Sequence, residues 1–200
     1  MALYAGHFDF TRPLIQTIDA LFSAEECARI IESVRGDEWL EATINSHRGR
    51  VVDRSIRDAS TAVVRDDSLA ETLFSRVRAS VPPSMIVEDF ETGARVTMEP
   101  EGVFVPLRVY RYTAGQRFGL HHDQSYLRED GARSLLTLLV YLNDDFTGGE
   151  TDFPEQRRCV TPQTGSALWF QHMLLHAGRA VNDGVKYVLR SDVLYRTTAR

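Results

Sequence analysis

The sequence predicts a mainly β fold with supporting helices, arranged as a double-sheet jelly roll. Three observations lead to this prediction. After Gly102 the chain contains eight short stretches with a strand-like pattern, turn residues separate them, and no long helical pattern lies between them. The expected strands are Phe104–Thr113, Arg117–His122, Ser134–Leu142, Glu150–Phe153, Arg158–Val160, Ser166–Phe170, His176–Val181 and Lys186–Tyr195.

Turn-forming residues stand between these stretches and mark where each strand ends. They are Gly115, Asp130-Gly131, Gly148-Gly149, Pro162 with Gly165, and Asn182-Asp183-Gly184. No repeat, low-complexity segment or linker divides the chain. We therefore expect one domain over residues 1–200, with a helical support and lid region over 1–100 and the jelly-roll core over 101–200.

Two helices are expected in the first half of the chain. Ser23 and Glu26 form a capping box, and apolar residues recur at helical spacing over Cys27–Val34. A second helix is expected over Ser68–Ala79, which has one apolar face and is stopped by Pro82-Pro83.

An arginine-rich polar stretch lies between the two helices, from Ala42 to Ser60. One interpretation is a solvated loop or an edge hairpin. The other is a lid over a binding site, because loops on a rigid scaffold often determine specificity. The cations of this stretch are Arg48, Arg50, Arg54 and Arg57.

Composition narrows the class of protein. The chain has 200 residues, 43% hydrophobic and 26% charged residues, and a net charge of -5, so a nucleic-acid partner is not favoured. The longest apolar stretch, Leu135–Leu142, is too short to span a bilayer, and no secretion signal is recognisable. Two cysteines, Cys27 and Cys159, make no disulfide framework. We expect a cytoplasmic protein with reduced cysteines that does not bind membranes.

Three residues have the spacing of a metal site: His121-x-Asp123, followed by His176. In a strand, residues i and i+2 point to the same face, so His121 and Asp123 can bind one metal together. A jelly roll can bring His176 alongside them. Two histidines and one carboxylate leave half of an octahedral metal open, which suits non-haem Fe(II) that also binds a co-substrate and O2.

The other histidines fit this site less well. Strand alternation directs His122 away from the metal, although a different register would make it the ligand. No partner at ligand spacing accompanies His172, His47 or His7, which we interpret as structural or exposed.

A cation ten residues after His176 completes the pattern. The chain has 23 cationic residues, and the only lysine is Lys186. A dicarboxylate co-substrate on the open metal face needs a distal cation, and Lys186 can supply it. Arg190 lies four residues later on the same strand face. It can be a second anchor, the salt-bridge partner of an internal carboxylate, or a substrate contact.

Three segments, in order along the chain, resemble the prolyl 4-hydroxylase-like 2-oxoglutarate/Fe(II) dioxygenases. They cover residues 100–195, and the first-helix segment Phe22–Cys27 is also similar. The three segments are Arg108–Asp123, Leu138–Phe153 and His176–Tyr187.

The resemblance implies a double-stranded β-helix and a set of site residues. It implies Fe(II) on His121, Asp123 and His176, with the far carboxylate of 2-oxoglutarate on Lys186. Tyr112 would donate its hydroxyl to 2-oxoglutarate, and Tyr141 is a second candidate donor. The family also implies O2 as co-substrate and ascorbate as a reductant.

The resulting functional prediction is a dioxygenase that hydroxylates an unactivated C–H bond and releases succinate and CO2. Its substrate would be a prolyl residue, an amino acid or a small metabolite, that is, a peptide or a small molecule. Arg57 is the residue expected to contact that substrate or to order the lid. The alternative is a silent jelly-roll protein that binds metal and 2-oxoglutarate as a sensor or scaffold.

Overall fold

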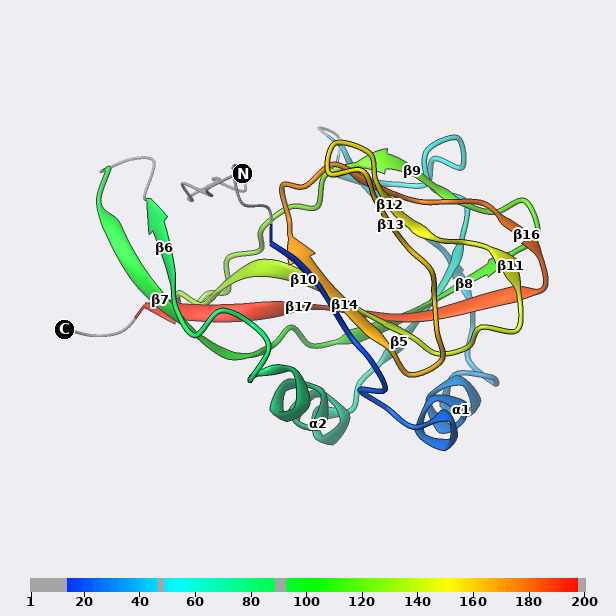
Figure 1. Ribbon diagram of the computed structural model, residues 1–200, viewed down its shortest axis with the longest axis horizontal. Helices are drawn as coiled ribbons and strands as arrows, with labels where there is room; N and C mark the ends of the chain where they lie inside the picture. Colours follow the sequence, from blue (N-terminus) through cyan, green and yellow to red (C-terminus); the bar gives the residue numbers. More distant parts are fainter. Residues whose placement is uncertain (1–13, 47–48, 89–92, 198–200) are drawn as a thin grey trace.

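The computed structural model describes residues 14–46, 49–88 and 93–197. Its strands form a large sheet and a smaller one that face each other, and both helices cover the outer face of the large sheet (Figure 1). This is the double-stranded β-helix, or jelly roll, that the strand pattern predicts. None of the helices in the described ranges is long and apolar enough to cross a membrane.

The large sheet is antiparallel and contains nine strands. Along its main path the order is β1 (Ile15–Ile18), β14 (Ala167–Gln171), β10 (Arg133–Tyr141), β17 (Val185–Thr197), β8 (Leu107–Thr113), β5 (Ser60–Val64) and β2 (Leu40–Glu41). The hairpin of β6 (Met85–Glu88) and β7 (Arg95–Val103) joins this sheet through β17.

The smaller sheet contains four strands and faces the middle of the large one. Their order is β13 (Arg158–Val160), β12 (Thr151–Phe153), β15 (His176–Gly178) and β9 (Phe118–His121). Two further pairs are β11 (Thr147–Gly148) with β16 (Val181–Asp183), and β3 (Ile44–Ser46) with β4 (Gly49–Val51).

Both predicted helices are present. In α1 (Ala24–Ser33) the Ser23 hydroxyl accepts a hydrogen bond from the Glu26 amide at 3.2 Å, and Glu26 accepts one from the Ser23 amide at 2.8 Å. The capping box is therefore confirmed. α2 (Asp67–Val77) starts one residue earlier than predicted, because Asp66 is its N-cap.

Strand alternation divides the core into two layers and positions the site. On β8, Leu107 and Val109 pack toward the helices, whereas Tyr110 and Tyr112 pack toward the smaller sheet. On β10, Tyr141 also faces the smaller sheet. The large sheet is buried on both faces, and its inner face is where polar side chains can surround a ligand.

The structure corrects the sequence prediction in two respects. The region before residue 104 is not mainly helical and irregular, because β1 to β7 lie within it and β1, β5 and β7 pair with strands of the second half. The expected strand His176–Val181 is two strands, β15 and β16, which pair with different partners. In both cases distant pairing partners decide strand formation, and local composition does not reveal them.

The arginine-rich stretch contains a hairpin, as one of its two interpretations proposed. β3 pairs with β4, and exposed Arg54 forms an ion pair with Glu41. Arg48 lies outside the described residues, together with His47 and His7. Arg57, at the end of the stretch, is buried, which the polar composition of the stretch does not suggest.

Candidate functional site

His121 and His176 meet because their strands are neighbours. β9 pairs with β15, and the two histidines are directly opposite each other in the register. Asp123 lies two residues beyond the end of β9, where its amide donates to the carbonyl of His172 at 2.9 Å. One ligand atom from each of His121, Asp123 and His176 lies within 4.8 Å of the other two.

Backbone hydrogen bonds determine which nitrogen of each histidine faces the centre of this cluster. His121 Nδ1 lies 2.8 Å from the carbonyl of Gly119, and His176 Nδ1 lies 2.9 Å from that of Leu174. In a neutral ring that donates through Nδ1, Nε2 keeps its lone pair. The two Nε2 atoms lie 3.7 Å and 3.6 Å from the Asp123 carboxylate oxygens.

The protonation states suit metal binding. Burial lowers the pKa of His121 to about 3 and also lowers the pKa of His176, so both rings are neutral near pH 7. Burial by itself would raise the pKa of Asp123, but Arg190, His176 and His121 outweigh it and lower that pKa. The cluster thus offers two neutral imidazoles and one carboxylate, the combination that non-haem iron takes.

His122 and His172 are outside the cluster. His122 is exposed, and its Nδ1 lies 2.9 Å from the carbonyl of Met173, as strand alternation predicts. His172 is buried next to Asp123, which agrees with the structural one of its two predicted roles.

Arg190 forms an ion pair with an internal carboxylate, one of the three roles open to it from the sequence. Its Nη2 lies 2.8 Å from Asp123 Oδ1 and 3.7 Å from Asp192 Oδ1. Burial opposes the charge, but these two aspartates outweigh it and raise the pKa of Arg190. Arg190 therefore orients the same carboxylate that faces the two histidines.

A chain of hydrogen bonds holds the other oxygen of Asp123. Thr137 Oγ1 donates to Asp123 Oδ2 at 2.6 Å and lies 2.8 Å from His172 Nδ1. His172 Nε2 lies 3.0 Å from Ser134 Oγ. Since the Thr137 proton points to the carboxylate, His172 donates through Nδ1 and accepts from Ser134. The sequence does not predict this chain, because its members share no spacing with the cluster.

Removing the Thr137 hydroxyl should weaken metal binding. Thr137→Val keeps the shape of the side chain but leaves Asp123 Oδ2 and His172 Nδ1 without their common partner. Loss of such a supporting hydrogen bond reduces metal affinity by about 10- to 100-fold. Competition against a metal chelator measures the affinity, and Thr151→Val serves as the matched control in the same pocket. Equal metal affinities in Thr137→Val and wild type would show that these hydrogen bonds do not orient the Asp123 carboxylate.

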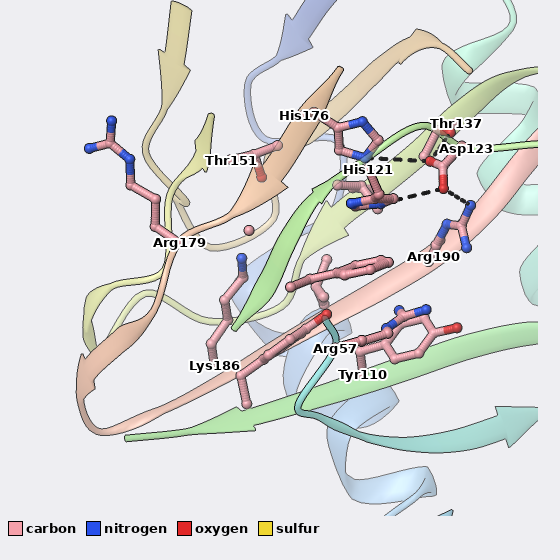
Figure 2. Close-up of a pocket in the computed structure, with 15 residues that line it drawn as sticks. Arg57, Tyr110, His121, Asp123, Thr137, Thr151, His176, Arg179, Lys186 and Arg190 are labelled. Atoms are coloured by element: carbon pink, nitrogen blue, oxygen red, sulfur yellow. Dashed lines mark hydrogen bonds and ion pairs between the residues drawn. The ribbon is translucent and has the colours of Figure 1, made fainter. Parts of the chain in front are cut away.

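Lys186 lies across the pocket from Asp123 (Figure 2). Its side chain is 5% exposed, and Nζ donates to the carbonyl of Gly149 at 2.6 Å. Gly149 has a φ of 71°, and a Cβ there would lie 3.2 Å from Lys186 Cδ. Within the described part of the chain, no carboxylate lies within 4 Å of Lys186, and burial lowers its pKa to about 8. A buried cation without an anionic partner indicates a site for an anionic ligand.

The two predicted tyrosines differ in position. Tyr112 lines the pocket directly opposite Lys186 in the sheet register. Tyr141 is fully buried behind the lining, and its hydroxyl lies 2.7 Å from Thr151 Oγ1. Thr151, which the sequence prediction missed, lines the pocket in place of Tyr141.

Arg57 also lines this pocket and is 6% exposed. Its guanidinium carbon lies 4.0 Å from the ring centre of Tyr110 and 4.2 Å from that of Phe118. Phe118 in turn stacks on His121, with ring centres 3.5 Å apart. Among the described residues Arg57 Nε has no hydrogen-bond partner, and Nη1 donates to the carbonyl of Thr43 at 3.4 Å. The ring of Phe118 therefore lies between Arg57 and the candidate metal ligand His121.

Comparison with known proteins agrees with this geometry. Residues 107–191 match the model of the 2OG-Fe(II) oxygenase superfamily. A putative prolyl 4-hydroxylase of Acanthamoeba polyphaga mimivirus is 33% identical over 122 residues, covering 52% of this chain and 50% of that protein. The chain spans about half the length of the curated relatives it matches.

Two solved structures have the same fold. A viral collagen prolyl hydroxylase from Paramecium Bursaria Chlorella virus-1 aligns with a TM-score of 0.58 and 21% identity, covering 90% of this chain and 95% of that one. A Trichoplax adhaerens prolyl hydroxylase, in complex with a hypoxia inducible factor peptide fragment, aligns with a TM-score of 0.62 and 18% identity, covering 90% and 82%.

Proposed function

We propose that this chain is a prolyl 4-hydroxylase-like member of the 2OG-Fe(II) oxygenase superfamily and that it acts as an Fe(II)- and 2-oxoglutarate-dependent dioxygenase. The proposed reaction is hydroxylation of an unactivated C–H bond, with 2-oxoglutarate converted to succinate and CO2. One observation carries the proposal: the three-ligand cluster lines the same pocket as a buried lysine that has no carboxylate within 4 Å among the described residues.

The residues of the cluster fit iron. His121 and His176 would bind it through Nε2, since Nδ1 of each ring faces a backbone carbonyl. Asp123 would supply the carboxylate, held in place by Arg190 and Thr137. Three protein ligands leave coordination positions open for co-substrate and O2.

The residues around Lys186 fit a dicarboxylate. Lys186 would hold the distal carboxylate of 2-oxoglutarate, and Tyr112 and Thr151 line the same pocket. Tyr141 would act through Thr151, because its hydroxyl contacts Thr151 rather than the pocket. An anion at this position would replace the solvation that the buried lysine lacks.

Bound iron and 2-oxoglutarate would supply the oxidising chemistry when O2 enters, and the protein residues would bind and orient them. Aromatic side chains would limit water near the iron, because Phe118, Phe153 and Phe170 pack against the two histidine ligands. Ascorbate would serve as an external reductant in this proposal.

A succinate-release screen tests the proposed function. Iron-loaded protein is incubated with 2-oxoglutarate and with proline-containing peptides, free amino acids or metabolite pools. Succinate release that depends on one of these substrates is the expected result. Tight binding of metal and 2-oxoglutarate with no succinate under any condition would instead favour the sensor or scaffold alternative.

Arg57 is proposed to order the substrate side of the pocket. Arg57→Ala removes the cation between Tyr110 and Phe118, so the apparent affinity for the primary substrate should fall. Affinity for 2-oxoglutarate should stay close to that of wild type, because Lys186 is unchanged. Steady-state kinetics with each substrate varied in turn measures both, and Arg54→Ala, which changes an exposed arginine of the same stretch, is the control. Loss of 2-oxoglutarate binding in Arg57→Ala would contradict this role.

A further inference from the structure

A groove of about 640 Å³ opens beside the candidate metal-ligand cluster of His121, Asp123 and His176. It shares Arg57, Tyr110, His121, Asp123 and Arg190 with the pocket that Lys186 lines, so a molecule in the groove can reach the candidate metal ligands. Its volume is in the range of small-molecule binding sites. Apolar side chains form part of its outer wall, including exposed Leu120, Ile56 and Tyr126.

The charges in the groove are unbalanced. Among the residues that the structure describes, four arginines line it, namely Arg50, Arg57, Arg108 and Arg190, and two carboxylates do so, Asp123 and Asp192. Both carboxylates form ion pairs with Arg190. Asp123 would also bind the metal. Within the described ranges, the other three arginines of the groove therefore have no carboxylate to compensate their charge.

Arg108 is the most informative of these cations. It lies directly opposite Arg190 in the pairing of β8 with β17, so two like charges share one face of the sheet. Such a pair is destabilising unless other charges compensate it. Arg190 has its two aspartates, but across the described ranges no carboxylate lies within 4 Å of the partly buried Arg108.

Burial and three nearby arginines make the positive charge of Arg108 still less favourable. Burial lowers its pKa from the usual value, the nearby Tyr110 opposes that change, and Arg50, Arg190 and Arg57 lower the pKa further. These arginines come from different parts of the chain: Arg108 and Arg190 from the large sheet, Arg50 from the β3–β4 hairpin, and Arg57 from the segment before β5. An arrangement in which separate elements direct cations at one space is typical of an anion site.

We propose that the primary substrate carries a carboxylate and that Arg108 binds it, with Arg57 and Arg50 on the same side of the groove. The proposal rests on the proposed function and adds the substrate class to it. An arginine binds a carboxylate through two parallel hydrogen bonds, which would fix the substrate's position relative to the metal. The carboxylate can belong to a free acid or to an acidic residue of a peptide.

Matched pairs of acid and amide probes test the proposal. Zinc replaces iron, so the protein with 2-oxoglutarate present holds both co-ligands without turnover. N-acetyl-L-proline is compared with N-acetyl-L-prolinamide, and acetyl-Pro-Glu-amide with acetyl-Pro-Gln-amide, by ligand-observed NMR titration. The acid of at least one pair should bind about 10- to 100-fold more tightly than its amide, the range expected for a charge-assisted hydrogen bond. The pair that shows the preference identifies the source of the carboxylate.

Variants of β8 assign the preference to a residue. Arg108→Gln should remove it, and Arg108→Lys should retain part of it, since the charge remains. Arg111→Gln is the matched control on the same strand, because Arg111 stacks on Trp39 outside the groove, at 4.5 Å from the ring centre. Equal binding of acid and amide in both pairs, no binding of either acid, or a preference that persists in Arg108→Gln would each overturn the proposal.

The readouts separate this inference from the proposed function. Zinc and 2-oxoglutarate binding are measured first on every sample. If both bind and no acid is preferred, only the carboxylate assignment fails. If neither binds, the proposed function fails, and the acid and amide titrations of the metal-free protein still test Arg108.

Discussion

Asp123→Ala is expected to abolish metal binding and turnover and to destabilise the fold. The variant lacks the single carboxylate of the cluster, and it also leaves Arg190 without its 2.8 Å partner. Breaking a buried ion pair on one side costs about 3–5 kcal/mol of unfolding free energy. We expect the lower end of that range, because the Arg190 side chain is 23% exposed and Asp192 remains near it.

Three measurements check this result. Metal content after iron loading and succinate release without primary substrate should both fall to background, and urea unfolding should give the loss of free energy. His122→Ala is the matched control, since His122 lies next to the cluster but contacts the carbonyl of Met173. The double variant Asp123→Ala, Arg190→Met should recover stability without recovering iron. Wild-type succinate release by Asp123→Ala, with trace wild-type protein excluded, would refute the metal assignment.

Lys186→Ala is expected to weaken 2-oxoglutarate binding by about 10- to 100-fold, which corresponds to a lost charge-assisted hydrogen bond of about 1.5–3 kcal/mol. Calorimetric titration of 2-oxoglutarate into the metal-loaded protein measures the change. Arg179→Ala is the control, because Arg179 lines the same pocket but forms an exposed ion pair with Asp152. An unchanged dissociation constant in Lys186→Ala would assign the distal carboxylate to another cation of the pocket.

The pH dependence of the same titration gives an independent check. The pKa of Lys186 in the free protein is lowered to about 8, so the lysine is charged below that pH and loses its proton above it. Binding of a carboxylate requires the charged form, so affinity should be level below about pH 8 and fall by up to about tenfold per pH unit above it. Lys186→Ala should lack this dependence.

Much of the site can be predicted from the sequence because its key spacings are local. His121 is the last residue of β9, and Asp123 lies two residues after it, so one short segment supplies two of the three ligands. His176 and Lys186 belong to strands whose patterns are also recognisable, and the capping box before α1 needs only four residues. Such features can be predicted because they depend mainly on residues that are close together in the sequence.

The roles of individual polar side chains were decided by the tertiary structure. From the sequence, Asp123→Ala removes only a ligand and leaves the fold intact. The ion pair with Arg190 changes that expectation, and it exists because β17 passes close to the segment after β9. Likewise, Tyr141 contacts Thr151 instead of the pocket, and a buried aromatic stack encloses Arg57.

The sequence by itself determined the fold class, the positions of most strands after residue 104, the metal-ligand spacing and the place of the lone lysine. The tertiary structure decided which early segments become strands, which carboxylate Arg190 binds and where Arg108 stands relative to it. The physical reason is that strand pairing joins residues far apart in the chain. The register of each pair then determines which side chains share a face, and hence which charges compensate one another.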